Sequence, residues 1–320
     1  MQYAGAVTGA DLEAHRGYLG AVLYRLTGDA AEADDLVQET FARALAHPEV
    51  AADADRPLRP WLLKVAVRLG IDALRARRTR DYPGPWLPTP IDTGEEASSD
   101  DAPDARYQLL ESASMAFLVA LEALSPQQRA VVVLREVFDL SVEETAAALS
   151  TTANSVKVAH HHGRAALTTY DAERLRPTRA AQQRARDLLA RFLFAVSTGD
   201  ATAARALLTP DVTATGDGGG RYLAGLKSIV GADRVARLYL HFAGRSDLSP
   251  RIEQVMANGL PALVVRVHDA SGRAAPISLL QFVPSPDGDR IARVFSVQVP
   301  EKLRSLLPGD AQTQSPRTQR

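Results

Sequence analysis

The stretch SVEETAAALSTTANSVKVAHHHGRAAL, residues 141–167, predicts two short helices joined by a tight turn. Ser141 and Glu144 form a capping box, because a serine followed three residues later by a glutamate satisfies free N–H groups at the start of a helix. Residues 150–152 (Ser-Thr-Thr) then turn the chain, and a second helix follows from Ala153 to about Tyr170. Two short helices with such a turn between them are the signature of a helix-turn-helix.

One face of the second helix is polar. Asn154, Lys157, His161 and Arg164 recur on it at three- and four-residue spacing. These side chains can donate hydrogen bonds to phosphates and base edges in a major groove. A solvated helix face explains the spacing equally well, so periodicity alone leaves both interpretations open. The run at residues 160–162 (His-His-His) predicts no metal site, because adjacent helical residues point about 100° apart.

Two helical blocks are predicted. The second covers residues 107–172 and includes a helix with Ser125 as its cap and Pro126 at its first position, where the missing N–H has no cost. The first covers residues 11–80, with apolar stripes at helical spacing.

Charge is distributed unevenly along the first block. The formal net charge of the chain is −1, so total charge does not indicate a nucleic-acid partner. An acidic cluster (Asp29, Glu32, Asp34, Asp35 and Glu39) nevertheless precedes a basic one (Arg59, Lys64, Arg68, Arg75, Arg77, Arg78 and Arg80). This pattern suggests two partners of opposite charge.

The rest of the chain divides into a linker, a third unit and a tail. Residues 81–106 are proline-rich and then acidic, which is typical of an extended linker. Residues 178–307 begin with an apolar helix and continue with strands near 262–267, 277–283 and 291–297, which predict an antiparallel meander in an α+β domain. Residues 308–320 are polar, and we expect them to be disordered.

Some classes of protein are excluded or disfavoured. The chain has no cysteine, which excludes disulfides, thiolate zinc sites and cysteine nucleophiles. It has no run of eighteen apolar residues and no basic-then-apolar signal pattern at its N-terminus. We therefore expect a cytoplasmic protein without a membrane partner.

The order of several motifs resembles a known family. Ala33-Asp-Asp-Leu-Val-Gln-Glu-Thr-Phe41, Pro60-Trp-Leu-Leu-Lys-Val-Ala66 and Ile71-Asp-Ala-Leu-Arg75 are similar to region 2 of extracytoplasmic-function sigma factors, and residues 121–167 resemble their region 4. The resemblance implies a transcription initiation factor that binds core RNA polymerase, at its clamp and flap, and directs it to the −10 and −35 elements of promoter DNA.

Three further segments resemble a subgroup with a SnoaL-like C-terminal domain. They are Asp81-Tyr-Pro-Gly-Pro-Trp-Leu-Pro-Thr-Pro90, Asp217-Gly-Gly-Gly-Arg221 and Val299-Pro-Glu-Lys-Leu303. The implied fold is multidomain, with two all-α domains followed by an α+β NTF2-like cone. Arg221, Val299 and Glu301 depart from the subgroup's motifs, and Ser150 stands where a glycine commonly makes the helix-turn-helix turn.

The resemblance assigns roles to residues in four groups. Asp34, Asp35 and Gln38 would bind core polymerase, and Lys64, Arg68, Arg75, Arg77 and Arg78 would contact −10 DNA. Asn154, Ser155, Lys157, His161 and Arg164 would contact −35 DNA. Interdomain regulation would involve Trp86, Leu87, Asp217, Gly218, Gly219, Gly220, Arg221, Pro300, Lys302 and Leu303. From its residues alone, the loop at 217–221 is by default a plain turn, and a phosphate cradle fits it less well. The resemblance makes an interdomain contact as favourable an interpretation as the plain turn.

Two other classes of function remain as alternatives. The chain could be a helix-turn-helix regulator fused to a ligand-binding or enzymatic SnoaL-like domain. Acid–base catalysis in that domain would draw on Asp211, Asp217, His241 and His268, but it needs groups within hydrogen-bond reach of the reacting atoms. We expect no catalytic residues, metal or cofactor, although an unknown small ligand in the cone is compatible with the sequence.

Overall fold

The computed structural model describes residues 8–47, 58–94, 110–245, 249–269 and 271–306. The chain divides into two compact units. The helical unit joins Met1–Asp81 to Phe117–Ala172, and the C-terminal unit joins Tyr82–Ala116 to Glu173–Arg320. The proline-rich linker therefore belongs to the C-terminal unit.

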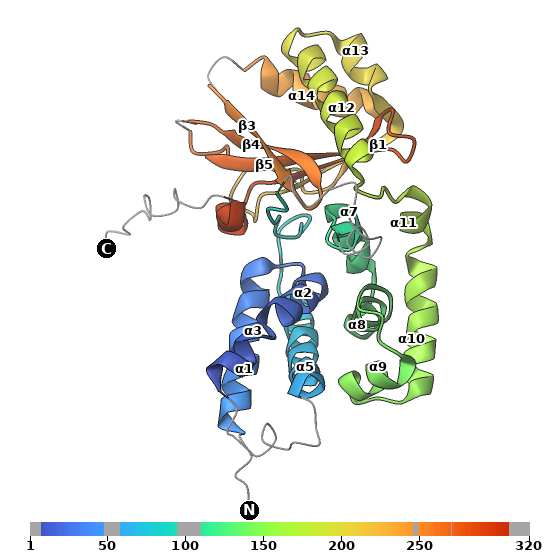
Figure 1. The fold of residues 1–320 in the computed structure, drawn as a ribbon. Coiled ribbons are helices and arrows are strands. Elements are labelled where there is room, and N and C mark those ends of the chain that lie inside the picture. Colours follow the sequence, from blue (N-terminus) through green and yellow to red (C-terminus); the bar gives the residue numbers. More distant parts are fainter. Residues whose placement is uncertain (1–7, 48–57, 95–109, 246–248, 270, 307–320) are drawn as a thin grey trace, which may run out of the picture. The chain divides into compact units, whose positions relative to one another are not determined.

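The helical unit contains the first predicted helical block and, from Phe117 on, the second, whose predicted start at residue 107 falls in the C-terminal unit (Figure 1). The first block comprises α1 (Gly9–Glu13), α2 (Arg16–Thr27), α3 (Ala30–Ala46) and α5 (Leu58–Thr79). The second comprises α7 (Met115–Ala120), whose first two residues fall in the C-terminal unit, η2 (Leu121–Ala123), α8 (Pro126–Val132), η3 (Val133–Val137), α9 (Val142–Leu149), α10 (Ala153–Ala166) and α11 (Thr168–Glu173). The η2 segment is a 3₁₀ turn, and η3 continues α8 as a π-helical turn.

The two helical blocks share a hydrophobic core. Its buried members are Val22 and Leu26 of α2, Leu63, Val67, Ile71 and Leu74 of α5, Ala130 of α8, Leu134 of η3 and Ala148 of α9. Burial of apolar area at roughly 25 cal/mol per Å² stabilises this contact. The blocks are thus packed directly against one another.

Side-chain caps begin three helices of the second block. Ser125 accepts from Gln128 N (3.2 Å) with Pro126 next to it, and Ser141 accepts from Glu144 N (3.1 Å). Both caps confirm the sequence prediction. Thr152 similarly accepts from Ser155 N (3.2 Å) at the start of α10.

The turn of the helix-turn-helix is made by Ser150. Its backbone is left-handed, with φ 51° and ψ 46°, which costs an L-residue roughly 1–2 kcal/mol. The following Thr151 N–H donates to the Ala146 carbonyl at 2.9 Å and closes the end of α9. The absence of glycine therefore leaves a strained but hydrogen-bonded turn.

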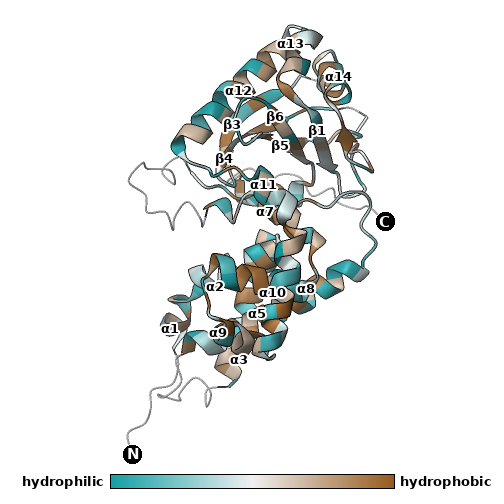
Figure 2. Cartoon of the chain, turned by 90° about the vertical axis from the view of Figure 1, so that its right-hand side faces the viewer, coloured by the Kyte–Doolittle hydropathy of each residue, from teal (hydrophilic) through white to brown (hydrophobic). Residues whose placement is uncertain are grey.

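The C-terminal unit is a sheet covered by helices. Its helices are α12 (Arg179–Ser197), α13 (Ala201–Ala206), α14 (Ala232–Ala243) and the 3₁₀ segment η4 (Pro300–Leu306). Its strands are β1 (Leu208–Asp217), β2 (Ile229–Val230), β3 (Arg251–Ala257), β4 (Leu260–Arg266), β5 (Ile277–Pro284) and β6 (Ile291–Val297). Figure 2 shows hydrophobic and hydrophilic residues alternating around α12, as expected for a helix with one buried face.

The strand order is β2-β1-β6-β5-β4-β3. The pairs β4–β5 and β5–β6 are antiparallel, which confirms the predicted meander of three strands. Strand β3, which was not predicted, extends the meander by pairing antiparallel with β4. Strand β1 instead runs parallel to β6, with Ala214 opposite Val294. The end of β1 at Asp217 lies opposite Val297, at the end of β6.

Side chains pack between the helices and the sheet. Phe192 of α12, Tyr239 of α14 and Phe282 of β5 form a ring cluster with centroids 5.5–5.7 Å apart. Burial raises the pKa of the Tyr239 hydroxyl. Aliphatic residues of all three helices and the sheet surround these rings, so this part of the cone is a packed core.

Candidate functional site

The proline-rich linker is fastened to the C-terminal unit by backbone hydrogen bonds. Asn258 N donates to the Ile91 carbonyl (3.0 Å), and Ile91 N donates to Asn258 Oδ1 (3.1 Å). Thr93 N also donates to the Met256 carbonyl (3.2 Å), and Asp92 forms a β-bridge with Ala257. The linker thus pairs along the turn between β3 and β4.

A buried ion pair lies under the linker. Lys302 Nζ is 2.7 Å from Asp217 Oδ2 and donates to the Leu87 carbonyl at 2.6 Å. The Leu87 N–H donates to the same carboxylate oxygen at 2.9 Å. Asp217 is 0% exposed and Lys302 8% exposed. Two charges so deeply buried require each other, because an unpaired charge there would keep its full desolvation cost.

Two aromatic residues of the linker complete this arrangement. The Tyr82 hydroxyl donates to Asp217 Oδ1 at 2.5 Å, and Lys302 Nζ lies 4.4 Å from the ring centre of Trp86. A cation over an indole face is a favourable contact. The structure therefore brings together Trp86, Leu87, Asp217 and Lys302, which the sequence grouped only through resemblance.

The glycine loop allows the linker to approach closely. Gly220 has φ 73°, and a Cβ added there would lie 2.7 Å from Pro83 Cγ. Gly219 N donates to Asp217 Oδ1 at 3.1 Å, and a Cβ on Gly218 would lie 2.6 Å from the Tyr222 carbonyl oxygen. The loop is accordingly both a tight turn and a contact surface.

The three residues that depart from the subgroup's motifs (Arg221, Val299 and Glu301) lie at or next to this loop. Arg221 forms an ion pair with Glu301, and its hydrogen bond lowers the pKa of the Glu301 carboxyl. Val299 lies against Gly219. Pro300 begins η4, on which Leu303 is 1% exposed. Arg221 and Glu301 thus pair with each other, and Val299 packs on the glycine loop.

The predicted −35 residues all lie exposed on α10. Their side chains differ in how far other residues already bind them. Arg164 is 2.9 Å from Glu136 and 3.0 Å from Asp171, whereas Lys157 makes no ion pair with any residue in the described part of the chain. Ser155 is engaged with the cap residue Thr152. Close packing of α10 on α8 at Gly163, where a Cβ would lie 2.7 Å from Val132 Cγ2, leaves the opposite face open.

The predicted −10 residues fall into two sets on α5. Lys64, Arg68 and Arg75 are exposed at helical spacing, with Arg75 paired to Asp72 at 3.0 Å. Arg77 instead donates to both carboxylate oxygens of Glu122 (2.8 and 2.9 Å) and to the Thr27 carbonyl (2.5 Å). Arg78 donates to the Leu124 carbonyl.

Glu122 also binds Arg129, whose side chain is 2% exposed. Burial lowers the pKa of Arg129, and the neighbouring carboxylate opposes that change. The Arg129 guanidinium additionally donates to the Arg25 carbonyl of α2 (3.3–3.4 Å). The two helical blocks are therefore joined by hydrogen-bonded charges as well as by their core.

The predicted polymerase-binding residues Asp34, Asp35 and Gln38 are exposed on α3. The buried side of that helix is formed by Ala33, Val37, Thr40, Phe41 and Ala44. The buried residues of α3 recur every three or four positions, so one face of the helix is packed and the other is acidic.

The titratable residues considered for catalysis do not form a common site. Asp211, His241 and His268 are exposed, and Asp217 is the buried partner of Lys302. Among the described residues, no three His, Cys, Asp or Glu side chains are arranged to hold a metal. No helix in the same part of the chain is long and apolar enough to span a membrane.

Several contact residues were missed from the sequence. Asn258 has φ 51°, and its side-chain amide donates to the Ala113 carbonyl at 2.6 Å. The dipeptide Asn258-Gly259 is a turn signal that could have located it. Glu122 and Arg129 carry no local signal, because their partners Arg77 and Arg25 lie far away in the sequence.

Comparison with family models finds three matches. Residues 12–80 match Sigma-70 region 2, residues 114–167 match Sigma-70 region 4, and residues 189–294 match the SnoaL-like domain. These are the families that the sequence motifs resembled.

Individual proteins give the same result. The chain is 32% identical to "ECF RNA polymerase sigma factor SigJ" of Mycobacterium tuberculosis (strain ATCC 25618 / H37Rv), over 92% of both chains. It is 31% identical to "Probable ECF RNA polymerase sigma factor SigI" of M. tuberculosis (strain CDC 1551 / Oshkosh), over 69% of this chain and 72% of that protein. The crystal structure of M. tuberculosis SigJ has a TM-score of 0.69 and 28% sequence identity, covering 93% of this chain and 99% of that one. The chain belongs to the extracytoplasmic-function RNA polymerase sigma factors, which direct the polymerase to promoters.

Proposed function

We propose that the helical unit described here is the closed form of the sigma factor, which must open to use a promoter. The observation that carries this proposal is the binding of Arg77 to Glu122 across the two helical blocks. In this form Arg77 and Arg78 are bonded to groups of region 4. They become available to −10 DNA only when region 4 moves away.

Promoter geometry supports the same conclusion. The −10 and −35 elements are about 25 base pairs apart, roughly 85 Å of duplex at 3.4 Å per base pair. A compact unit of about 140 residues is only roughly 40 Å across. Since α5 and α9 share a core, the two regions must separate before both elements can be contacted.

In the open form, the exposed faces of regions 2 and 4 bind core polymerase and promoter DNA. The acidic face of α3, with Asp34, Asp35 and Gln38, docks on the polymerase clamp, while region 4 docks on the flap. Lys64, Arg68 and Arg75 join Arg77 and Arg78 on −10 DNA, and Asn154, Ser155, Lys157, His161 and Arg164 face the −35 duplex. The protein acts where the polymerase is, in the cytoplasm.

The C-terminal unit controls this opening by holding the linker between the two regions. Its contacts with Tyr82, Leu87 and Ile91 shorten the free length of chain that joins region 2 to region 4. A shorter tether favours association of the two regions, because it raises their effective concentration. The role of this unit is regulatory, and no catalytic residue is assigned to it.

Promoter-driven transcription tests the regulatory role. Truncation after Val299 removes Lys302 and should raise transcript output above that of the full-length protein. Truncation after Leu307 is the matched control, since it removes only the polar tail and should leave output unchanged. Deletion of everything after Thr178 removes the anchor altogether and should change output as well. Equal output from all four proteins would contradict control by the C-terminal unit.

A further inference from the structure

The second helix of the helix-turn-helix exposes one large apolar side chain. Val158 of α10 is 49% exposed. Among the described residues of the helical unit, the only other large apolar side chain that is exposed is Leu45, near the end of α3. Alanine forms helices better than valine, because a β-branched side chain loses rotamer freedom in a helix. Helix propensity therefore gives no reason for a valine at this exposed position.

Val158 lies on the same side of α10 as two of the predicted −35 residues. Val156 is fully buried and packs on α8 and α9. At roughly 100° per residue, Asn154, Val158 and His161 lie about 140–200° around the helix from Val156. Asn154 and His161 are both exposed. Val158 therefore lies between two polar side chains on the face that points away from the rest of the helix-turn-helix.

The charge of α10 fits a DNA duplex. Residues 153–166 contain no aspartate or glutamate, and Lys157, beside Val158, is exposed. In the major groove thymine presents a methyl group at its C5 position, which accepts contacts from small apolar side chains. A small apolar group among donors and cations thus matches a groove that contains thymine.

We propose that Val158 contacts the 5-methyl group of a thymine in the −35 element and so contributes to the choice of promoter. The inference rests on the −35 contact proposed above for α10, and it adds a residue that distinguishes one base from another. Asn154 lies one turn earlier, about 6 Å along the helix axis, and its amide suits an adenine edge. At about 3.4 Å per base pair, the thymine lies within about two base pairs of the base that Asn154 contacts.

Duplexes that differ by one methyl group test the proposal. The holoenzyme first selects its preferred −35 element from promoter duplexes randomised over that element. Each thymine of the selected element is then replaced singly by uracil, which pairs in the same way but lacks the methyl group. The parent holoenzyme should bind one of these uracil duplexes about fourfold more weakly, the effect expected for one buried methyl group. Holoenzyme with Val158→Ala should bind the thymine and uracil duplexes equally well.

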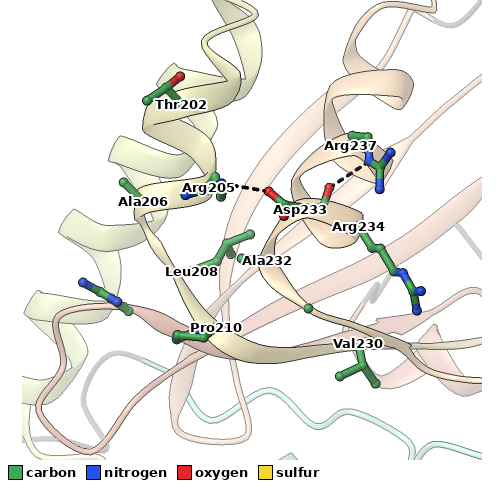
Figure 3. Close-up of a pocket in the computed structure, with 12 residues that line it drawn as sticks. Thr202, Arg205, Ala206, Leu208, Pro210, Val230, Ala232, Asp233, Arg234 and Arg237 are labelled. Atoms are coloured by element: carbon green, nitrogen blue, oxygen red, sulfur yellow. Dashed lines mark hydrogen bonds and ion pairs between the residues drawn. The ribbon is translucent and has the colours of Figure 1, made fainter.

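Val230→Ala is the matched control. Val230 is a valine of nearly the same exposure (50%), at the edge of the pocket between α13, α14 and β1 in the C-terminal unit (Figure 3). Its replacement should leave the fourfold preference unchanged. Lys157→Ala should weaken binding of both duplexes by the same factor, because a phosphate contact reads no base. Unaltered thermal unfolding of Val158→Ala, expected for a better helix former, establishes that the fold is intact.

Four results would overturn the proposal, each in a different way. A methyl preference that persists in Val158→Ala assigns the thymine to another residue, and equal weakening on every duplex assigns Val158 to a surface of the polymerase. The proposal also fails if the parent binds every uracil duplex as tightly as the thymine duplex, or if the selected element has no thymine on either strand. Selection of no −35 sequence at all would contradict the −35 contact of α10 itself, and this proposal with it.

Discussion

Glu122 receives Arg77 through both of its carboxylate oxygens, at 2.8 and 2.9 Å, and so joins the end of α5 to the second helical block. The same carboxylate is the counter-charge of the buried Arg129. One acidic side chain is therefore the shared counter-ion of two cations from different regions of the sigma factor.

Replacing Glu122 with Gln should lower the free energy of unfolding of the helical unit by about 2 kcal/mol, because Arg129 would keep its desolvation cost without an anion. Denaturant unfolding followed by circular dichroism measures the change. Glu143→Gln, at an exposed position of α9, is the control and should shift the free energy by less than about 0.5 kcal/mol. Equal stability of the two variants would show that the Glu122 contacts contribute nothing.

Replacing Lys302 with Met should lower the melting temperature of the C-terminal unit by roughly 6–12 °C, since a buried carboxylate loses its cation at a cost of about 3 kcal/mol. The chain has two tryptophans, so a Trp61→Phe background makes Trp86 the sole indole. Its fluorescence should shift to longer wavelength as the linker is released. Lys227→Met, at an exposed site, is the control. An unshifted Trp86 spectrum in the Lys302 variant would rule out a role for Lys302 in holding the linker.

Reversing the acidic face of α3 by Asp34→Arg with Asp35→Arg should abolish binding to core polymerase while leaving helix content unchanged, because both side chains are exposed. Co-purification with core polymerase measures the effect. Asp187→Arg with Asp211→Arg reverses two exposed acids of the C-terminal unit and should bind normally. Unchanged co-purification of the Asp34 and Asp35 variant would remove α3 from the polymerase interface.

Replacing Lys157 and Arg164 together with Ala should weaken promoter binding by the holoenzyme and flatten its dependence on salt. Lys157→Ala alone should account for most of the change, about one unit in the slope of log affinity against log salt. Arg164 already shares its charge with Glu136 and Asp171, so its single variant should change the slope less. Lys227→Ala serves as the control. Identical slopes for the double variant and the parent would exclude both residues from the phosphate contacts.

Replacing Ser150 with Gly should raise the free energy of unfolding by about 0.5–1 kcal/mol, because glycine adopts a φ of 51° without steric cost. Ser150→Val should lower it by about 1 kcal/mol or more, since a β-branched residue is disfavoured in the left-handed region. Denaturant midpoints of the two variants test the ranking. A valine variant as stable as the glycine variant would mean that the turn is not strained.

Local sequence patterns identified the features that depend on neighbouring residues. The caps at Ser125 and Ser141 were predictable because each motif is satisfied within four residues. The meander of β4, β5 and β6 was predictable from apolar segments separated by turn residues. The parallel placement of β1 beside β6 and the binding of Arg77 by Glu122 were not, because each joins segments far apart in the sequence and leaves no periodic trace.

The site around Asp217 illustrates the same limit. An aspartate followed by three glycines predicts a turn, and its chemistry alone does not indicate which charge it pairs with. Family resemblance grouped Asp217 with Lys302 and Leu87, and the structure brings them within hydrogen-bonding distance. Tyr82 and Pro83 belong to the linker motif, but the sequence could not predict that these two residues contact the glycine loop and Asp217. That contact depends on how the folded chain runs past the loop.

The contact between Leu87 and Lys302 joins residues 215 positions apart, and this separation has a consequence during protein synthesis. At translation rates of about 5–20 residues per second, the ribosome needs roughly 10–40 s to make Lys302 after Leu87. Both sigma regions leave the ribosome within that interval, before the residue that fastens their linker exists. A nascent or truncated chain that stops before Lys302 thus carries both sigma regions without the contact that fastens the linker between them.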